Sequence, residues 1–397
     1  MPVFKYLNAA LASLAFLCLS VHAQHSHHGK TELASSVAMD AAGRLWLVSK
    51  ETADDGQYVV VQTSTDMGRS WSTARRVQEQ PEPVSADGEN RPKIAFGSKG
   101  ELYITYTKPL AKPYTGEIRL VRSIDGGKHF APPVTVHAHR EVITHRFDSL
   151  IVDGEGRLYV AWIDKRDMHA AAARKKKYAG AALYYTVSED GGASFKGDYK
   201  VADHSCECCR IALALNPQGR PVALWRHVFA PNVRDHALAE LTPDGKPGAP
   251  MRASFDDWRI DACPHHGPSL AYAADGTRHQ VWFNVKDNEG GVFYAAADAS
   301  GMLGKPMRLG SAQAAHADLA VSGRDVVLAW KQFDGQSTAV LGKISHDGGK
   351  SWADVELART RGVSDQPRLL NTAAGIVLIW RTQHEGVRTV MADGSLK

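Results

Sequence analysis

Apolar and polar positions along the chain repeat as pairs of short strands rather than as helices. In the first copy, Ser36–Ser49, an apolar strand leads through an Asp/Gly turn into a second strand that carries a tryptophan. Related copies span 92–106 and 147–162, and four more end at Trp225, Trp282, Trp330 and Trp380. Seven copies at intervals of roughly 50 to 60 residues match the length of a four-stranded propeller blade. Because β-branched and aromatic residues are enriched in these segments, the pattern predicts an all-β fold, a β-propeller of seven units.

A second motif, Ser-x-Asp-x-Gly-x-x-aromatic, follows four of the strand pairs. Its Ser and Asp side chains suit hydrogen bonding within a tight turn, its glycine takes a positive φ, and its ring fills the gap between hairpins. Degenerate copies at Thr242–Gly245 and near Asp298 lie between the third and fourth clear ones. We interpret the motif as a marker of the fold rather than as catalytic machinery. The clear copies are Ser64–Trp71, Ser123–Phe130, Ser188–Phe195 and Ser345–Trp352.

This motif is the Asp box, and through it the chain resembles the sialidase superfamily, whose members carry the box on a six-bladed propeller. The resemblance covers residues 36–390. Our count of seven units differs from the six blades that the resemblance implies, and the last unit lacks an outer strand after Asp393. Either the N-terminal segment completes a seventh blade or one unit is not a full blade. We expect seven blades, with the six-bladed sialidase type as the alternative.

The first 23 residues have the features of a signal peptide. Lys5 supplies a positive charge, Ala9–Val21 is apolar, and small residues lead to a cleavage point after Ala23. We therefore expect export, to the periplasm or out of the cell. Residues 24–35 would then form a His-containing N-terminal segment, and residues 36–397 a single β-propeller domain.

Charge and hydropathy argue against two classes of partner. A formal net charge of +4 over 397 residues is too weak to indicate nucleic-acid binding. No run of about 18 apolar residues follows the N-terminus, so we expect no transmembrane segment in the mature chain.

The strand order predicts where a functional site should lie. Loops that enter each first strand gather around one mouth of the central channel, while the Asp boxes lie on the opposite face. Such a mouth is where a propeller normally builds its site. The residues before the inner strands are rich in Cys, His and Arg, and they include Glu89–Arg91, His145, Arg146, Cys206–Arg210, Cys263–His266, His316 and Gln366–Arg368.

The sulfur and imidazole groups among these residues predict a metal site. One Cys-rich segment enters the fourth unit and a Cys/His segment enters the fifth, so the two can meet at the mouth. Thiolate and imidazole suit soft or borderline ions, and copper is favoured for an exported protein, with zinc as the alternative. The predicted ligands are Cys206, Cys208, Cys209, Cys263, His265 and His266, with His145 and His316 as second choices.

Other states of the cysteines stay open. In an oxidising compartment, one of the clustered cysteines can pair with Cys263 and pin two neighbouring blades. One such bridge can also leave the other sulfurs and histidines available for metal or redox chemistry. The histidines flanking Cys263 favour a metal, because a disulfide has no need of imidazoles. A run at His25–His28 would place further imidazoles near the new amino terminus, which either binds Cu(II) or stays a solvated tail.

The resemblance to sialidases also implies an enzymatic alternative. Sialidases hold the substrate carboxylate with three arginines, the first in an Arg-Ile-Pro motif, and use an Asp acid/base with a Tyr–Glu nucleophile. The early inner strands here lack that motif, and Arg210-Ile-Ala comes closest, beside Cys209 in the fourth unit. No Tyr–Glu pair can be assigned, so whether the protein is an enzyme stays open. If it is, it is an exo-α-sialidase-like hydrolase or another glycan-active protein, with a carboxylate clamp of Arg91, Arg146, Arg210 and Arg368.

A basic run follows the second strand of the third unit, in a predicted long loop on the face of the site. It consists of Arg174, Lys175, Lys176 and Lys177. It is either a solvated loop or a contact for an anionic glycan or envelope partner. We therefore expect an exported, sialidase-like propeller that binds a metal at its channel mouth and acts in metal handling.

Overall fold

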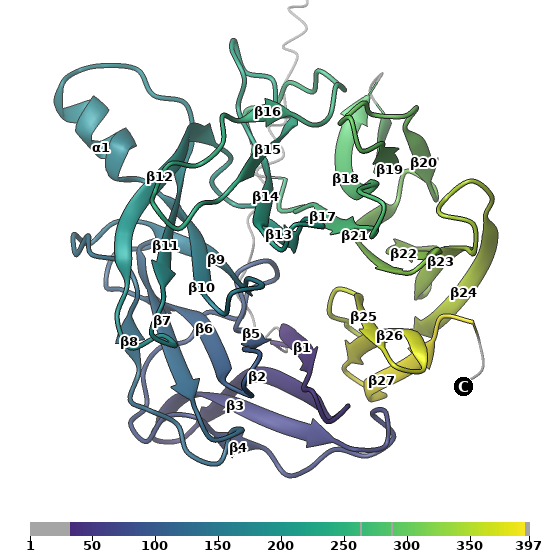
Figure 1. Cartoon of the computed structure of the whole chain (residues 1–397), viewed down its shortest axis with the longest axis horizontal. Helices are drawn as coiled ribbons and strands as arrows, with labels where there is room; N and C mark the ends of the chain where they lie inside the picture. The colour runs from purple at the N-terminus through teal and green to yellow at the C-terminus, as the bar shows by residue number, and fades with distance from the viewer. Residues whose placement is uncertain (1–31, 263, 287–288, 394–397) are drawn as a thin grey trace, which may run out of the picture. The chain divides into compact units, whose positions relative to one another are not determined.

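The sequence repeats fold as seven successive antiparallel sheets (Figure 1). The computed structural model describes residues 32–393 except 263, 287 and 288. The predicted signal peptide, the histidines at 25, 27 and 28, and Cys263 lie outside the described residues.

The first four sheets have four strands each. The first contains β1 (Ser35–Met39), β2 (Leu45–Ala53), β3 (Gly56–Ser64) and β4 (Arg75–Arg76). The second contains β5 (Lys93–Phe96), β6 (Leu102–Pro109), β7 (Gly116–Ser123) and β8 (Val134–Thr135). The third contains β9 (His145–Val152), β10 (Leu158–Asp164), β11 (Ala181–Ser188) and β12 (Lys196–Ser205). The fourth contains β13 (Ala212–Leu215), β14 (Pro221–Arg226), β15 (His236–Glu240) and β16 (Met251–Arg252).

The remaining sheets complete the series. The fifth contains β17 (Ser269–Tyr272), β18 (Arg278–Lys286), β19 (Glu289–Ala297) and β20 (Met307–Leu309). The sixth contains β21 (Ala314–Ser322), β22 (Asp325–Phe333), β23 (Thr338–Ser345) and β24 (Ala353–Thr360). Among the described residues the seventh has three strands, β25 (Arg368–Thr372), β26 (Gly375–Thr382) and β27 (Gly386–Met391).

The first strands of consecutive sheets contact one another in a closed ring, in which β1 also contacts β25 (Figure 1). Within each sheet the strands follow in chain order and run antiparallel. The arrangement is a seven-bladed β-propeller, which confirms the predicted fold and the count of seven units rather than the six-bladed alternative. Strand β1 belongs to the first blade, so the seventh blade closes the ring with three strands.

The core lies between neighbouring blades. The second strands of four blades each contribute a tryptophan that is less than 2% exposed: Trp162, Trp225, Trp282 and Trp380. The largest apolar cluster joins the third and fourth blades, where Tyr159 and Tyr185 of one pack with Trp225 of the other. Burying each such ring stabilises the fold by about 1.5–3 kcal/mol, so blade-to-blade packing holds the ring together.

The Asp boxes form the turns that the sequence predicts. Ser64 Oγ donates to Asp66 Oδ1 over 2.7 Å and accepts from the Gly68 amide over 2.8 Å. The equivalent bonds recur in the other three boxes. The second box also explains its glycine, because a Cβ on Gly127 would lie 2.3 Å from the Trp46 ring of the preceding blade. The Asp-box turn therefore packs one blade against the next.

Within the described part of the chain, one helix interrupts the strands. Arg166–Ala173 forms α1, between β10 and β11, where the sequence analysis expected a loop. The basic run Arg174–Lys177 follows it directly and is exposed. No helix among the described residues is long and apolar enough to cross a membrane.

Candidate functional site

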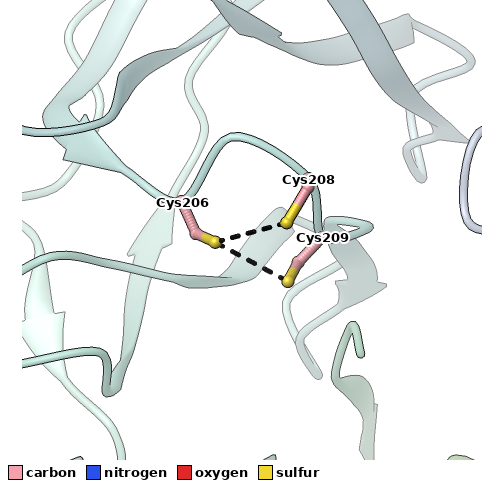
Figure 2. A group of neighbouring side chains, drawn as sticks. All are labelled: Cys206, Cys208 and Cys209. Carbon is pink, nitrogen blue, oxygen red and sulfur yellow. Dashed lines mark hydrogen bonds between the residues drawn. The ribbon is translucent and has the colours of Figure 1, made fainter. Parts of the chain in front are cut away.

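Three cysteines meet in the turn between β12 and β13 (Figure 2). The Cys206 amide donates to the carbonyl of Arg226 over 2.9 Å, which fixes the start of the turn against β14. The Sγ atom of Cys206 lies 3.8 Å from that of Cys208 and 3.8 Å from that of Cys209. All three side chains are buried, in the cluster that joins the third and fourth blades.

The spacing of these sulfurs fits a shared metal ion. A disulfide requires sulfurs about 2.05 Å apart, so none joins these three cysteines to one another. Tetrahedral metal–thiolate bonds about 2.3 Å long place their sulfurs about 3.8 Å apart. The observed Sγ–Sγ distances of 3.8 Å match that value. Across the described residues, these three form the one group of three or more Cys, His, Asp or Glu ligand atoms within 4.8 Å of one another.

The protonation of the cluster is uneven. Hydrogen bonds from Cys208 and Cys209, together with the positive charge of Arg226, hold the pKa of Cys206 well below its usual range despite burial. The contact with Cys206 and burial raise the pKa of Cys209. The Cys206 thiolate is therefore stabilised by hydrogen bonds from the neighbouring thiols. A thiophilic cation bound to the three sulfurs would displace the protons of those thiols.

Two contacts hold the cysteine turn from outside. Glu207, between the first two cysteines, forms an ion pair with Lys165 at the end of the third blade's β10. Arg234, in the loop between β14 and β15, directs Nη1 to within 3.8 Å of Cys206 Sγ. The sequence analysis did not single out Arg234, because no motif marks that loop and only the fold brings it to the sulfurs.

The predicted histidine ligands lie apart from this group. His265 is exposed and takes a positive φ of 54°. His266 stacks on Phe283 with ring centroids 4.1 Å apart and lies 4.5 Å from the ring of His316. Burial, reinforced by His316, lowers the pKa of His266 to about 3, so this ring is neutral. The fourth predicted cysteine, Cys263, lies outside the described residues.

The second-choice ligand His145 belongs to a separate histidine cluster. Its Nε2 lies 3.1 Å from His139 Nδ1, and its ring stacks on that of His137 at 4.0 Å. Burial lowers the pKa of His145, and burial also lowers the pKa of His137 to about 3. The rings of His137 and His145 are therefore stacked and neutral.

Two of the four predicted clamp arginines are engaged in buried ion pairs. Arg91 Nη1 lies 2.8 Å from Asp365 Oδ1 and also donates to the carbonyl of Ser35 over 2.9 Å. Arg210 Nη1 lies 3.4 Å from Glu89 Oε2, and its other nitrogens donate to the carbonyls of Pro268 and Ala317. These contacts join blades across the channel, and both guanidiniums are buried, although Arg91 Nη2 has no hydrogen-bond partner among the described residues.

The carboxylate of Glu89 contacts several residues at the channel mouth. Its carboxylate accepts from Gln366 Nε2 over 3.1 Å and from the Gly267 amide over 3.4 Å, and it lies 3.5 Å from His316 Nδ1. Arg210 and His316 hold the pKa of Glu89 well below its usual range despite full burial. The mouth is thus filled by a polar network of protein groups.

The other two arginines are more accessible. Arg146 Nη2 lies 3.1 Å from Asp87 at the surface of the mouth. Arg368 Nη2 donates to Gln366 Oε1 over 3.4 Å. The structure therefore separates the four predicted arginines into two buried ones and two partly exposed ones.

Sequence comparison identifies no relative. No protein-family description and no curated protein matches the chain.

Solved structures are similar in fold. A polysaccharide lyase, an ulvan lyase bound to a glucuronic acid–rhamnose 3-sulfate saccharide, matches with a TM-score of 0.55 at 9% identity, over 90% of this chain and 91% of its own. The Hadza microbial sialidase Hz136 matches with a TM-score of 0.51 at 14% identity, over 75% of this chain and 63% of its own. An α-L-arabinofuranosidase mutant from Fusarium graminearum matches with a TM-score of 0.50 at 13% identity, over 79% and 92%.

These likenesses confirm the sialidase-like propeller, and at such identities they show the fold alone. The named neighbours are glycan-active enzymes. Function must therefore be argued from the residues of this chain.

Proposed function

We propose that this protein binds a soft metal ion, copper in preference to zinc, through Cys206, Cys208 and Cys209. The observation that carries the proposal is the pair of 3.8 Å Sγ–Sγ distances within one buried turn. Those distances suit thiolates on one ion and do not suit a disulfide. Cys263, His265 and His266 remain predicted ligands, and the group of three thiols forms without them.

The chemistry of the donors favours copper. An all-sulfur site selects Cu(I), with Zn(II) as its main competitor. The cysteines are buried to 1–4% exposure, which restricts access by water and by large redox partners. We propose that the protein acts in metal handling outside the cytoplasm, where the signal peptide expected from the sequence would place it.

Elemental analysis and thiol counting test the proposal. The full chain is expressed with its N-terminal segment and purified anaerobically from the export compartment. We expect close to one copper or zinc per chain, and thiols that an alkylating reagent modifies only after the metal is removed. No bound metal, with all four thiols of the mature chain oxidised, would overturn the proposal.

Glycan binding or hydrolysis is the second candidate, and the neighbours' activities favour it. It would need a carboxylate clamp of Arg91, Arg146, Arg210 and Arg368 at the channel mouth. The buried pairs of Arg91 with Asp365 and of Arg210 with Glu89 weigh against that clamp. Turnover of a fluorogenic sialoside by the purified protein, abolished by Arg368→Ala but retained in Cys206→Ala, would support the enzyme instead.

A further inference from the structure

Two arginines beside the cysteine turn have no carboxylate partner among the described residues. Arg226 is 1% exposed, and the acceptors of its hydrogen bonds are neutral oxygens: Asn284 Oδ1 at 2.7 Å and the carbonyls of Arg234, His266 and Phe283. Arg234 donates to Asn232 Oδ1 over 3.2 Å and reaches Cys206 Sγ at 3.8 Å. Buried guanidinium charges are normally paired, so Arg226 is expected to have a negative neighbour, and Arg234 is a partly buried second charge beside it.

In the described part of the chain, the nearby aspartates form no ion pair with either guanidinium. Asn284, which accepts from Arg226, donates to Asp235 and Asp256. The Asp235 charge is already taken by an ion pair with Arg252. Asp256 accepts hydrogen bonds from the Asn284 amide and the Trp282 indole, so Asn284 lies between its carboxylate and Arg226. Neither carboxylate therefore forms an ion pair with Arg226 or Arg234, and the group that Arg234 does contact is the sulfur of Cys206.

Hydrogen bonds hold the loop around Arg234 and orient its guanidinium. Its amide donates to the carbonyl of Trp258 over 2.6 Å, and its own carbonyl accepts from Arg226 Nη1 over 2.9 Å. Asn232 fixes Nε on one side. The two backbone bonds hold the loop and the bond from Nε orients the guanidinium, whose Nη1 lies 3.8 Å from Cys206 Sγ.

Charge then distinguishes between metals. Three thiolates carry three negative charges, and Arg226 with Arg234 return two positive ones. Each positive charge repels a divalent ion about twice as strongly as a monovalent ion at the same position. An uncompensated buried charge is unfavourable, so the arginines favour the ion of lower charge.

We propose that Arg234 is a specificity-determining residue that biases the thiol site toward monovalent Cu(I) and against divalent ions. This inference rests on the proposed function, since it assigns the valence preference of the same site. Arg234 acts through its fixed positive charge beside Cys206 Sγ and is not itself a ligand. The direction of the bias does not depend on how many thiolates bind, because removing one positive charge always favours the more highly charged ion.

The test compares Cu(I) and Zn(II) affinities of the full chain by competition with chromophoric chelators under anaerobic conditions. Arg234→Gln removes the charge and keeps much of the side-chain volume, while Arg234→Lys keeps the charge. We expect Arg234→Gln to lower the ratio of Cu(I) to Zn(II) affinity by roughly tenfold or more, and Arg234→Lys to keep most of it. Arg220→Gln, which removes an exposed arginine paired with Glu240, serves as the control and should leave the ratio unchanged.

The outcomes are distinguishable. A wild-type protein that binds neither ion overturns the proposed function itself. A wild-type protein that binds Cu(I), with Arg234→Gln weakening both ions equally, overturns the specificity role and reduces Arg234 to a structural contact. Unfolding curves of each variant without metal show whether the loop has stayed folded. If Arg234→Gln does not fold, the Arg234→Met and Arg234→Lys pair provides the same comparison of charge.

Discussion

Arginines lie at both the channel mouth and the cysteine turn, but their positive charges have different partners in the two regions. At the mouth, Arg91 lies against Asp365 and Arg210 against Glu89, so the protein supplies its own counter-charge. At the turn, Arg226 and Arg234 have sulfur and neutral oxygens as neighbours. A site whose charges are already paired stabilises the fold, whereas one that lacks its counter-charge is suited to a ligand. Under the proposed function, the channel mouth stabilises the fold and the cysteine turn between the third and fourth blades binds the metal.

The largest effect on the contrast should come from removing a sulfur. Cys206→Ala deletes the atom shared by both short sulfur contacts. Because two thiolates hold a soft ion far less tightly than three, we expect copper affinity to fall by well over tenfold. Chelator competition measures the fall. Cys18→Ala, in the predicted signal peptide, is the control and should retain full binding.

Removing the negative charge of Glu89 at the mouth should destabilise the fold without changing metal binding. Glu89→Gln leaves Arg210 buried with only carbonyl partners and the amide of Gln366. We expect the free energy of unfolding to drop by about 3 kcal/mol or more, measured with denaturant, while metal stoichiometry stays the same. Glu155→Gln breaks an exposed pair with Arg157 and should cost less than about 1 kcal/mol. A loss of metal in Glu89→Gln would show that the two regions are not independent.

Acid should weaken the mouth in a defined direction. The pKa of Glu89 is well below its ordinary value of 4.5 in the folded protein, so its ion pair stabilises the fold above that pH. This contribution is lost as the pH falls below about 4.5 toward the folded value. We therefore expect the unfolding free energy of the wild type to fall more steeply than that of Glu89→Gln when both are titrated from neutral pH into acid. Parallel curves would show that Glu89 does not titrate as the geometry requires.

The smallest effect concerns the outer tether of the cysteine turn. Lys165→Met breaks the pair with Glu207, whose side chain is 32% exposed. Partly exposed pairs contribute about 1 kcal/mol or less, so stability should change little. Because the tether restrains the turn, we expect faster release of the metal to a chelator in stopped-flow mixing. An unchanged release rate would mean that the turn is held by its buried contacts alone.

Much of the fold could be predicted from the chain because its signals are local. The Asp box lies within eight residues, so Ser64, Asp66 and Gly68 identify their own turn, and the repeats give the number of blades. The helix α1 was missed, because Arg166–Ala173 is a short, exposed segment with no buried face.

The candidate site was only partly visible in the sequence. Cys206, Cys208 and Cys209 are neighbours in the chain, so their meeting was predictable. Which arginines pair with carboxylates was not, because Asp365 is 274 residues from Arg91 and Glu89 is 121 residues from Arg210. Arg234 reaches Cys206 only through a loop of the next blade. Such contacts depend on the closed ring and leave no pattern along the chain.

X-ray absorption of the copper-loaded protein tests the central claim most directly, because it reports the atoms bound to the metal. The account predicts Cu(I) with a first shell of sulfur, in which the three cysteines of the turn take part, and a loss of sulfur scattering in Cys206→Ala. A first shell made of nitrogen and oxygen, unchanged by that substitution, would contradict it.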